Sequence, residues 1–199
     1  MNFRVALAVL GVAVVATACS GTVGGTATPS APASTTALPY GGAPKVDNPL
    51  PDDIFSSGPC QALTPEQLKQ QLGATVPGKP DISAKVQSCD FHGGTGAYIG
   101  VSYFTKDNDG LSTVYTQVRP MMKRFTPLPP IQGFPAVAYD SDPGPNSPAC
   151  EVAVGVTDQL SFLLTVGLGE SAAGKEDPCP GAIGVAGDVV TTLKKKAGR

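Results

Sequence analysis

Several residues on which common enzyme chemistries depend are scarce in this sequence or missing from it. A single histidine makes the H-E-x-x-H motif of zinc peptidases impossible, and no serine stands in the G-x-S-x-G motif of α/β hydrolases. Lys and Arg number 14 against 16 Asp and Glu, and this formal net charge of −2 offers no basic surface for nucleic acid. We therefore expect a protein that is not an enzyme, with no cofactor and no nucleic-acid partner.

The polar groups that remain suggest no chemistry by their spacing. His92 and Asp90 lie two residues apart in an expected strand, so they share a face, but a metal site needs three or four ligands. We interpret the pair as a solvent-facing strand end. The glycine-rich residues 93–100 lack the Lys-Ser/Thr of a phosphate-binding loop and predict a hairpin turn. Two acidic pairs lie in loops without apolar neighbours and are expected to be solvated: Asp52-Asp53 and Glu176-Asp177.

The N-terminal residues have the organisation of an export signal. Arg4 precedes an apolar run over residues 5–15, too short to remain as a membrane-spanning helix, and small residues then lead to Cys19. A cysteine directly after a small residue resembles the lipobox of bacterial lipoproteins, in which the thiol is diacylated and becomes the first residue of the mature chain. The resemblance implies a signal peptide over residues 1–18 and lipidation of Cys19. The alternative is an ordinary secreted protein cleaved after Ala18.

The next thirty residues have the composition of a flexible linker. Residues 19–48 contain almost no large apolar side chains and are rich in Gly, Ser, Thr, Ala and Pro. Such a segment cannot bury enough surface to offset the entropy of ordering the chain, so it predicts a disordered tether that spans about 30 Å. We expect this lipidated tether to be followed by a single folded domain over residues 49–199.

Four cysteines remain in the expected domain: Cys60, Cys89, Cys150 and Cys179. An even number in an exported protein predicts two disulfides, because the compartment is oxidising. Three pairings are possible. We favour Cys60 with Cys89 and Cys150 with Cys179, since each bond then ties a helix to the strand nearest to it in sequence.

Alternating apolar residues predict a mostly antiparallel sheet of about five strands. The strongest signal is residues 150–169, two alternating arms around the polar turn 157–159, which is typical of a buried hairpin. The other expected strands are residues 86–92, 98–104 and 136–139.

Three helices are expected beside this sheet. Thr64 begins a capping-box pattern with Gln67, residues 111–125 have helical spacing interrupted by Pro120, and residues 182–193 form an amphipathic pattern near the C-terminus. The element order predicts an α+β fold with the helices packed on one face of the sheet and two disulfides holding it together.

The cysteine framework and its neighbours resemble the small mycobacterial cell-envelope lipoproteins typified by LprB, a family whose domain has no assigned function. The resemblance covers nearly the whole mature domain and implies a disulfide-linked α+β domain tethered outside an actinobacterial membrane. It supplies no catalytic residues. The segments that carry it are Pro59-Cys60, Cys89-Asp90-Phe91, Ile131-Gln132-Gly133 with Ala136-Val137-Ala138, Cys150-Glu151-Val152 and Pro178-Cys179.

These observations favour a monomeric binding module held at the extracytoplasmic face of the cell membrane by a diacylglyceryl anchor. Its partner would be an envelope protein, glycan or lipid. A second hypothesis is a carrier of a lipid or small apolar ligand, and a third is an extracytoplasmic sensor domain. The carrier hypothesis rests on aromatic and Met residues that we expect either to line a cavity or to belong to the core: Tyr98, Phe104, Tyr115, Met121, Met122 and Phe125.

Overall fold

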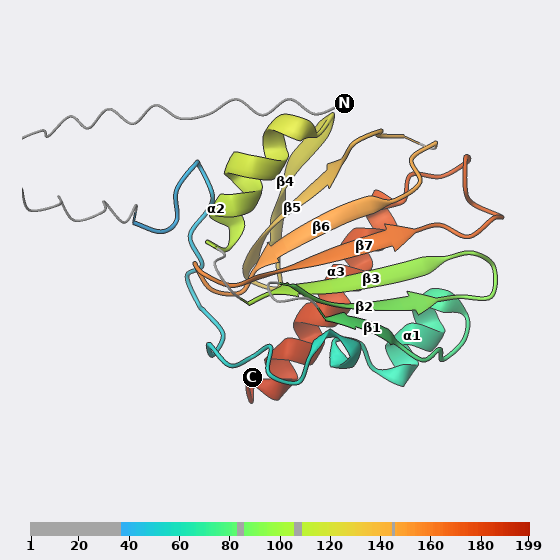
Figure 1. The fold of residues 1–199 in the computed structure, drawn as a ribbon, viewed down its shortest axis with the longest axis horizontal. Helices are drawn as coiled ribbons and strands as arrows, with labels where there is room; N and C mark the ends of the chain where they lie inside the picture. The colour runs from blue at the N-terminus through green and yellow to red at the C-terminus, as the bar shows by residue number, and fades with distance from the viewer. Residues whose placement is uncertain (1–36, 83–85, 106–108, 145) are drawn as a thin grey trace, which may run out of the picture. The chain divides into compact units, whose positions relative to one another are not determined.

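In the residues that the structure describes, seven antiparallel strands form one sheet in the order β1-β2-β3-β7-β6-β5-β4 (Figure 1). The structure is a computed structural model and describes residues 37–82, 86–105, 109–144 and 146–199. The predicted signal peptide and Cys19 lie outside these ranges. The strands are β1 (Lys79–Ile82), β2 (Val86–His92), β3 (Tyr98–Phe104), β4 (Arg124–Ile131), β5 (Phe134–Asp140), β6 (Cys150–Gly155) and β7 (Ser161–Gly167).

The prediction of about five strands was wrong because both edge strands were missed. The five expected strands are β2, β3, β5, β6 and β7, which occupy the interior of the sheet. The edge strand β1 contains Pro80, and β4 contains Pro127, Pro129 and Pro130. Proline has no N–H to donate to a neighbouring strand, so it is tolerated at a sheet edge, where one side of the strand needs no partner. The prolines of β1 and β4 are therefore compatible with edge positions.

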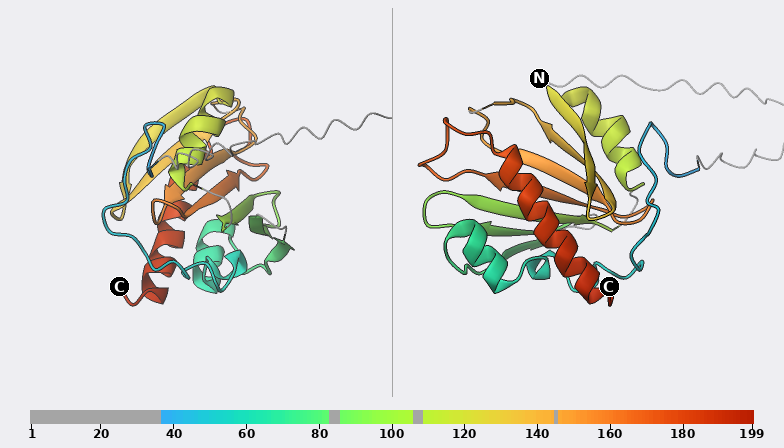
Figure 2. Two further views of the ribbon diagram at one scale, coloured as in Figure 1. Left: turned by 60° about the vertical axis from the view of Figure 1, so that its left-hand side comes forward. Right: turned by 180° about the vertical axis from the view of Figure 1, so that it is seen from behind.

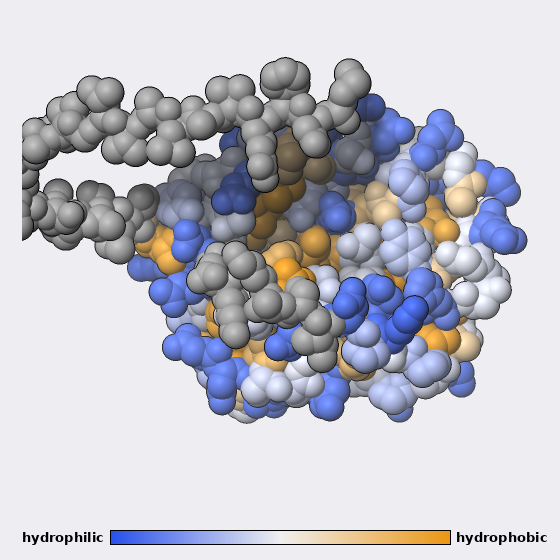
Figure 3. All heavy atoms as spheres, in the orientation of Figure 1, coloured by the Kyte–Doolittle hydropathy of each residue, from blue (hydrophilic) through white to orange (hydrophobic). Residues whose placement is uncertain are grey.

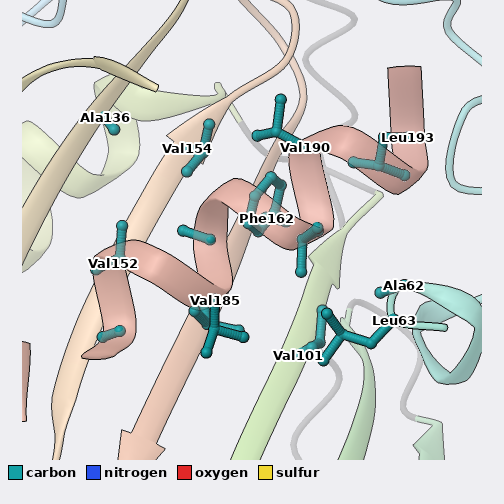
Figure 4. Packing of buried hydrophobic residues seen from close by; sticks show 14 of the residues in the cluster. Ala62, Leu63, Val101, Ala136, Val152, Val154, Phe162, Val185, Val190 and Leu193 are labelled. Atoms are coloured by element: carbon teal, nitrogen blue, oxygen red, sulfur yellow. The ribbon is translucent and has the colours of Figure 1, made fainter. Parts of the chain in front are cut away.

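One face of the sheet is closed by the C-terminal helix α3 (Cys179–Lys196), which crosses it diagonally (Figure 2). Helix residues such as Val185 and Val190 pack against β6 and β7, where Val152 and Phe162 point toward the helix (Figure 4). We call this side the α3 face. It holds the larger of the two hydrophobic cores.

The prediction that helices pack on one face only was also wrong. A run of three short helices lies against the opposite face of β5 and β6, where Val137 and Ala153 form a second, smaller core with it. This run, the α2 segment, consists of α2 (Leu111–Thr113), the π-helix η2 (Val114–Val118) and the 3₁₀-helix η3 (Arg119–Met121). The helix expected over residues 111–125 ends early, because the chain at Met122 is already extended and leads into β4.

Residues 37–58 form a strap without strand or helix that is fastened to the domain along its length. The Tyr40 hydroxyl donates to Asp109 Oδ2 at 2.6 Å, beside the α2 segment. Farther on, the Val46 N–H donates to Asp158 Oδ1 at 2.8 Å in the β6–β7 turn. The strap therefore connects the region beside the α2 segment with the turn of the β6–β7 hairpin.

The strap also extends into the main core. The Phe55 ring stacks on the Tyr103 ring with centroids 4.1 Å apart, and both side chains are buried. We expected the tether to continue to residue 48, but residues between 40 and 46 are already hydrogen-bonded to the domain. Tyr40 and Val46 show this difference, since their hydrogen-bond partners are 69 and 112 residues away in the sequence and leave no signal in local composition.

Two disulfides join elements of the α3 face. Cys60 in η1 (Pro59–Gln61) is bonded to Cys89 in β2, and Cys150 in β6 is bonded to Cys179 at the start of α3. These are the pairings that the sequence order favoured. The short helix α1 (Pro65–Leu72) follows η1 and begins at the Thr64 capping box, which the structure contains as predicted.

Candidate binding face

The side of the sheet opposite α3 is covered only in part by the described helices. The α2 segment lies over β5 and β6, whereas no described helix lies over β2, β3 and β7 in Figure 1. Hydrophobic side chains gather beside the α2 segment, and paler and hydrophilic ones lie over β2 and β3 (Figure 3). We call this uncovered area the open face. Strand alternation and register place these residues on it: Ser88, Asp90, His92, Tyr98, Gly100, Ser102, Glu151, Leu163, Thr165 and Gly167.

A row of directly paired residues crosses the open face. Asp90 pairs with Gly100, Gly100 with Thr165, and Thr165 with Glu151. Neighbouring strands lie about 4.8 Å apart, so the backbones of the two acidic residues at the ends of the row are separated by about 14 Å. Both end residues are half-buried, as is Thr165 between them. The row is thus a shallow polar surface with one acid at each end.

Glycines form the floor of this surface. A Cβ atom at Gly100 would lie 3.0 Å from Asp90 Oδ1, so even a methyl group would crowd the carboxylate. The Tyr98 ring lies over Gly167 so closely that a Cβ there would overlap it. Gly167 therefore leaves room for the Tyr98 ring, and Gly100 leaves room for the Asp90 carboxylate.

Two titratable groups of the open face have raised pKa values. Burial and the nearby Asp140 carboxylate raise the pKa of Glu151. Burial, together with the charges of Glu151 and Asp90, raises the pKa of Tyr98. The four strands β2, β3, β6 and β7 contain no Lys or Arg, and their only carboxylates are these two. Burial is the largest cause of both shifts, and the neighbouring carboxylates add to it.

An apolar hollow adjoins the row where the α2 segment meets the sheet. Its volume is about 80 Å³, and its walls come from the π-helix and from the strands. Leu163 and Ala153, which line it, each lie two residues along their strand from the row residues Thr165 and Glu151. The residues lining it are Phe104, Thr113, Val114, Val118, Tyr139, Ala153 and Leu163. A polar surface and an apolar hollow are therefore neighbours on this side of the sheet.

Two of the polar groups weighed from the sequence lie on the open face. His92 and Asp90 share it as alternation predicted, His92 is exposed, and its ring lies 6.2 Å from the Tyr98 ring. The glycine-rich residues 93–100 form the turn of the β2–β3 hairpin and the first residues of β3. Among the described residues no group of three His, Cys, Asp or Glu side chains is arranged to hold a metal ion.

The expected solvated pair Glu176-Asp177 is only half solvated, because Asp177 binds Arg124. Arg124 Nη1 donates to Asp177 Oδ2 at 2.5 Å and Nη2 to Asp177 Oδ1 at 3.0 Å. Nη2 also donates to the buried Asp140 carboxylate at 2.9 Å and lies 2.9 Å from Cys179 Sγ. The Arg124 hydrogen bonds hold the pKa of Asp177 below its ordinary value. Both terminal nitrogens of Arg124 have carboxylate partners, whereas its buried Nε has none among the described residues. We interpret the network as structural support for the second disulfide.

The aromatic and Met residues considered for a ligand carrier do not surround one cavity. Phe104 lines the apolar hollow, Tyr98 lies on the open face, and Met121 is 68% exposed. Tyr115 and Phe125 pack edge to face with ring centroids 5.0 Å apart. These residues are therefore divided between the hollow, the open face, the exposed surface and the smaller core.

Sequence reasoning missed the importance of Glu151, Thr165 and Gly100. One signal was present: Glu151 is the only charged residue in the two arms of the strongest apolar hairpin. A charge that alternates with buried valines must face away from the core they form. The strand order was needed to show that Asp90 shares its row.

A model of the protein family DUF3558, whose description is protein of unknown function, matches residues 14–192. No curated protein and no solved structure has significant similarity to the chain. Within the described ranges, no helix has both the length and the apolar character needed to cross a membrane.

Proposed function

The chain belongs to the DUF3558 family, and we propose that it is a lipoprotein anchored at the extracytoplasmic face of the membrane, whose domain is a non-enzymatic binding module. In this proposal Cys19 carries the lipid, the following residues keep the domain away from the bilayer, and the open face binds a component of the cell envelope. The observation that carries the proposal is the polar row Asp90–Gly100–Thr165–Glu151, which lies across four strands and over which none of the described helices lies (Figure 1).

The difference between the two faces of the sheet supports a binding role for the open face. A sheet that needed only stability would bury both faces or leave one of them uniformly polar. Here the uncovered half has a glycine floor, an aromatic ring and an apolar hollow within a few residues of one another. Exposed surfaces of this mixed character are typical of recognition sites.

A site-specific crosslink tests the binding face. A photoreactive phenylalanine analogue replaces Thr165 on the open face in one variant and Thr126, an exposed threonine of β4, in a matched control. We expect irradiation of cells to give a discrete crosslinked species from position 165 and none from position 126. Equal labelling from both positions, or none from position 165 in stably folded protein, would contradict the proposed surface.

A second experiment tests the anchor. In Cys19→Ser the acceptor thiol for the diacylglyceryl group is missing, so we expect the protein to leave the membrane fraction and to lose incorporation of labelled palmitate. Two acyl chains give stable anchoring because each buried CH₂ contributes about 0.8 kcal/mol. Retention of the variant in the membrane after a high-salt wash would contradict the anchor.

The carrier alternative receives less support. The apolar hollow of about 80 Å³ is smaller than the roughly 300 Å³ at which small-molecule pockets usually begin. It suits a single small side chain better than a lipid. We therefore keep the binding module as the proposed function.

A further inference from the structure

A groove lies between the strap, the α2 segment and the edge strand β4. The strap runs beside the α2 segment in Figures 1 and 2, and residues of both line the groove together with residues of β4 and β5. Its volume is about 440 Å³, within the range of roughly 300–1,000 Å³ that is usual for small-molecule sites. It shares no lining residue with the apolar hollow or the open face.

Prolines form much of the groove wall. Four of the lining residues are prolines, contributed by the strap, β4 and β5: Pro44, Pro127, Pro130 and Pro135. A proline ring is apolar, and its backbone nitrogen carries no hydrogen to donate. The wall therefore offers apolar contact to a ligand but few hydrogen-bond donors.

Two polar side chains of the α2 segment, Tyr115 and Arg119, line the same groove. Tyr115 is 8% exposed, and its hydroxyl has no hydrogen-bond partner among the described residues. Arg119 is exposed and has no ion-pair partner within the described ranges. Tyr115 belongs to the π-helix η2, and π-helical turns are frequent at functional sites.

Phe125 holds the two polar groups close to each other. Its ring packs edge to face on Tyr115 with centroids 5.0 Å apart, and the Arg119 guanidinium carbon lies 5.5 Å from its centroid. Burial raises the pKa of Tyr115, and the positive charge of Arg119 opposes part of this rise. A cationic donor and a hydroxyl donor therefore lie together in an apolar groove.

The lining determines the charge of a matching ligand. Arg119 is the only charged residue among the described residues that line the groove. It therefore balances one negative charge, as on a carboxylate, rather than the charge of about −1.5 to −2 on a phosphate monoester. A guanidinium also binds a carboxylate through two parallel N–H groups.

The proline wall favours an acyl chain over a peptide. A peptide in the groove would lose water from its own N–H and C=O groups, and the prolines have no N–H to offer in its place. An acyl chain has no polar groups to satisfy and gains from apolar contact.

We propose that this groove binds a single-chain amphipathic carboxylate of the fatty-acid type. Arg119 and the Tyr115 hydroxyl donate hydrogen bonds to the carboxylate, and the acyl chain lies along the proline wall. Because the ligand contacts both the strap and the α2 segment, its binding holds the two together. The site is separate from the open face and does not depend on the function proposed for that face.

The test uses the full chain and soluble probes, with binding followed by NMR through the backbone amide shifts of the protein. We expect octanoate to shift the amides of Tyr115, Arg119 and Leu128. Octylammonium has a chain of the same length with the opposite charge and should bind at least about tenfold more weakly. Acetate, which has the carboxylate without the chain, should cause no shifts at the same concentration.

Matched variants separate the local charge from the net charge. Arg119→Gln should weaken octanoate binding about tenfold, because the ion pair is lost. Lys69→Gln removes the same charge at an exposed position of α1, away from the groove (Figure 1), and should leave the affinity within about twofold. Tyr115→Phe keeps the ring and removes only the hydroxyl, so we expect a loss of about fivefold.

Several outcomes would overturn the site. These are equal affinity for octanoate and octylammonium, equal weakening in Arg119→Gln and Lys69→Gln, and octanoate shifts confined to other surfaces. Tighter binding of octyl phosphate than of octanoate would contradict the single-charge argument. Tighter binding of the peptide acetyl-APAL, which ends in a free carboxylate, would overturn the acyl chain as the occupant.

Discussion

The two faces of the sheet are made by the same strands but differ in what packs against them. On the α3 face, residues such as Val101, Val152 and Phe162 are wholly buried beneath a long helix, and both disulfides join elements on that side. On the opposite face, the α2 segment covers only the β5 and β6 end, and the remaining half is polar. Stability is therefore concentrated on one face, which leaves residues of the other free to serve recognition.

The largest effect that this comparison predicts is a cavity in the α3 face. Phe162→Ala removes a fully buried ring that faces α3 and should lower the free energy of unfolding by about 3–5 kcal/mol. Thr165→Ala, three residues later on the open face, should change it by no more than about 0.5 kcal/mol. Urea denaturation of both variants measures the difference. If the two variants lost similar amounts of unfolding free energy, the open face would contribute as much to stability as the α3 face does.

The second prediction concerns the covalent ties. Each disulfide has a sequence separation of 29, and closing a loop of that length contributes about 3–4 kcal/mol in the chain-entropy account. Replacing Cys150 and Cys179 by Ala should lower stability by this amount. The same replacement of Cys60 and Cys89 is the comparison, and denaturation of the oxidised proteins gives both values. A negligible loss from either pair would show that the native state gains nothing from that bond.

A smaller effect is expected where the Arg124 network meets the start of α3. Asp177→Asn should cost about 1 kcal/mol at neutral pH, since Asp177 is partly exposed and solvent weakens its ion pair. Because the folded-state pKa of Asp177 is lowered, its contribution is complete above the unfolded pKa of about 3.9 and disappears as pH falls through the folded pKa.

The matched control for Asp177 is Asp142→Asn, which breaks an exposed ion pair with Lys123. We expect it to change stability by less than about 0.5 kcal/mol at any pH. Denaturation curves recorded from neutral to acidic pH compare the two variants. A difference between wild type and Asp177→Asn that persists at the lowest pH would contradict the assigned pKa direction.

The smallest predicted effect has the opposite sign and lies on the open face. Burial and Asp140 raise the folded-state pKa of Glu151, so ionising this residue destabilises the folded protein. The penalty is absent below the unfolded pKa and complete above the folded pKa. Glu151→Gln should therefore increase stability by about 0.5 kcal/mol at neutral pH and by nothing in acid. A loss at neutral pH would mean that the carboxylate has a stabilising partner.

The interior of the sheet could be predicted from the sequence and its edges could not. Alternation in the arms around Val152 and Leu164 reports burial directly, because period two is the geometry of a strand. The edge strand β4 has three prolines and half of its side chains exposed, so neither propensity nor alternation marks it. The helix expected over residues 111–125 was overextended for the same reason, since its last residues belong to that strand.

The open face could be predicted only one strand at a time. Alternation placed Asp90 with His92, but nothing local connects Asp90 with Glu151, sixty-one residues later in the sequence. Their common row depends on β7 returning to pair with β3 after the chain has crossed to the far edge of the sheet. Such nonlocal pairing is set by tertiary packing rather than by propensity.

The strap determines how the domain would respond to mechanical load. Tension on the chain ahead of residue 37 would first act on the hydrogen bond between Tyr40 and Asp109, then on Val46, and later pull Phe55 from its stack on Tyr103. Peeling would stop at Cys60, where the disulfide to β2 carries the force into the sheet. Residues 37–60 would by then have released about 80 Å of extra length. A domain built this way would yield at its strap and keep its sheet intact.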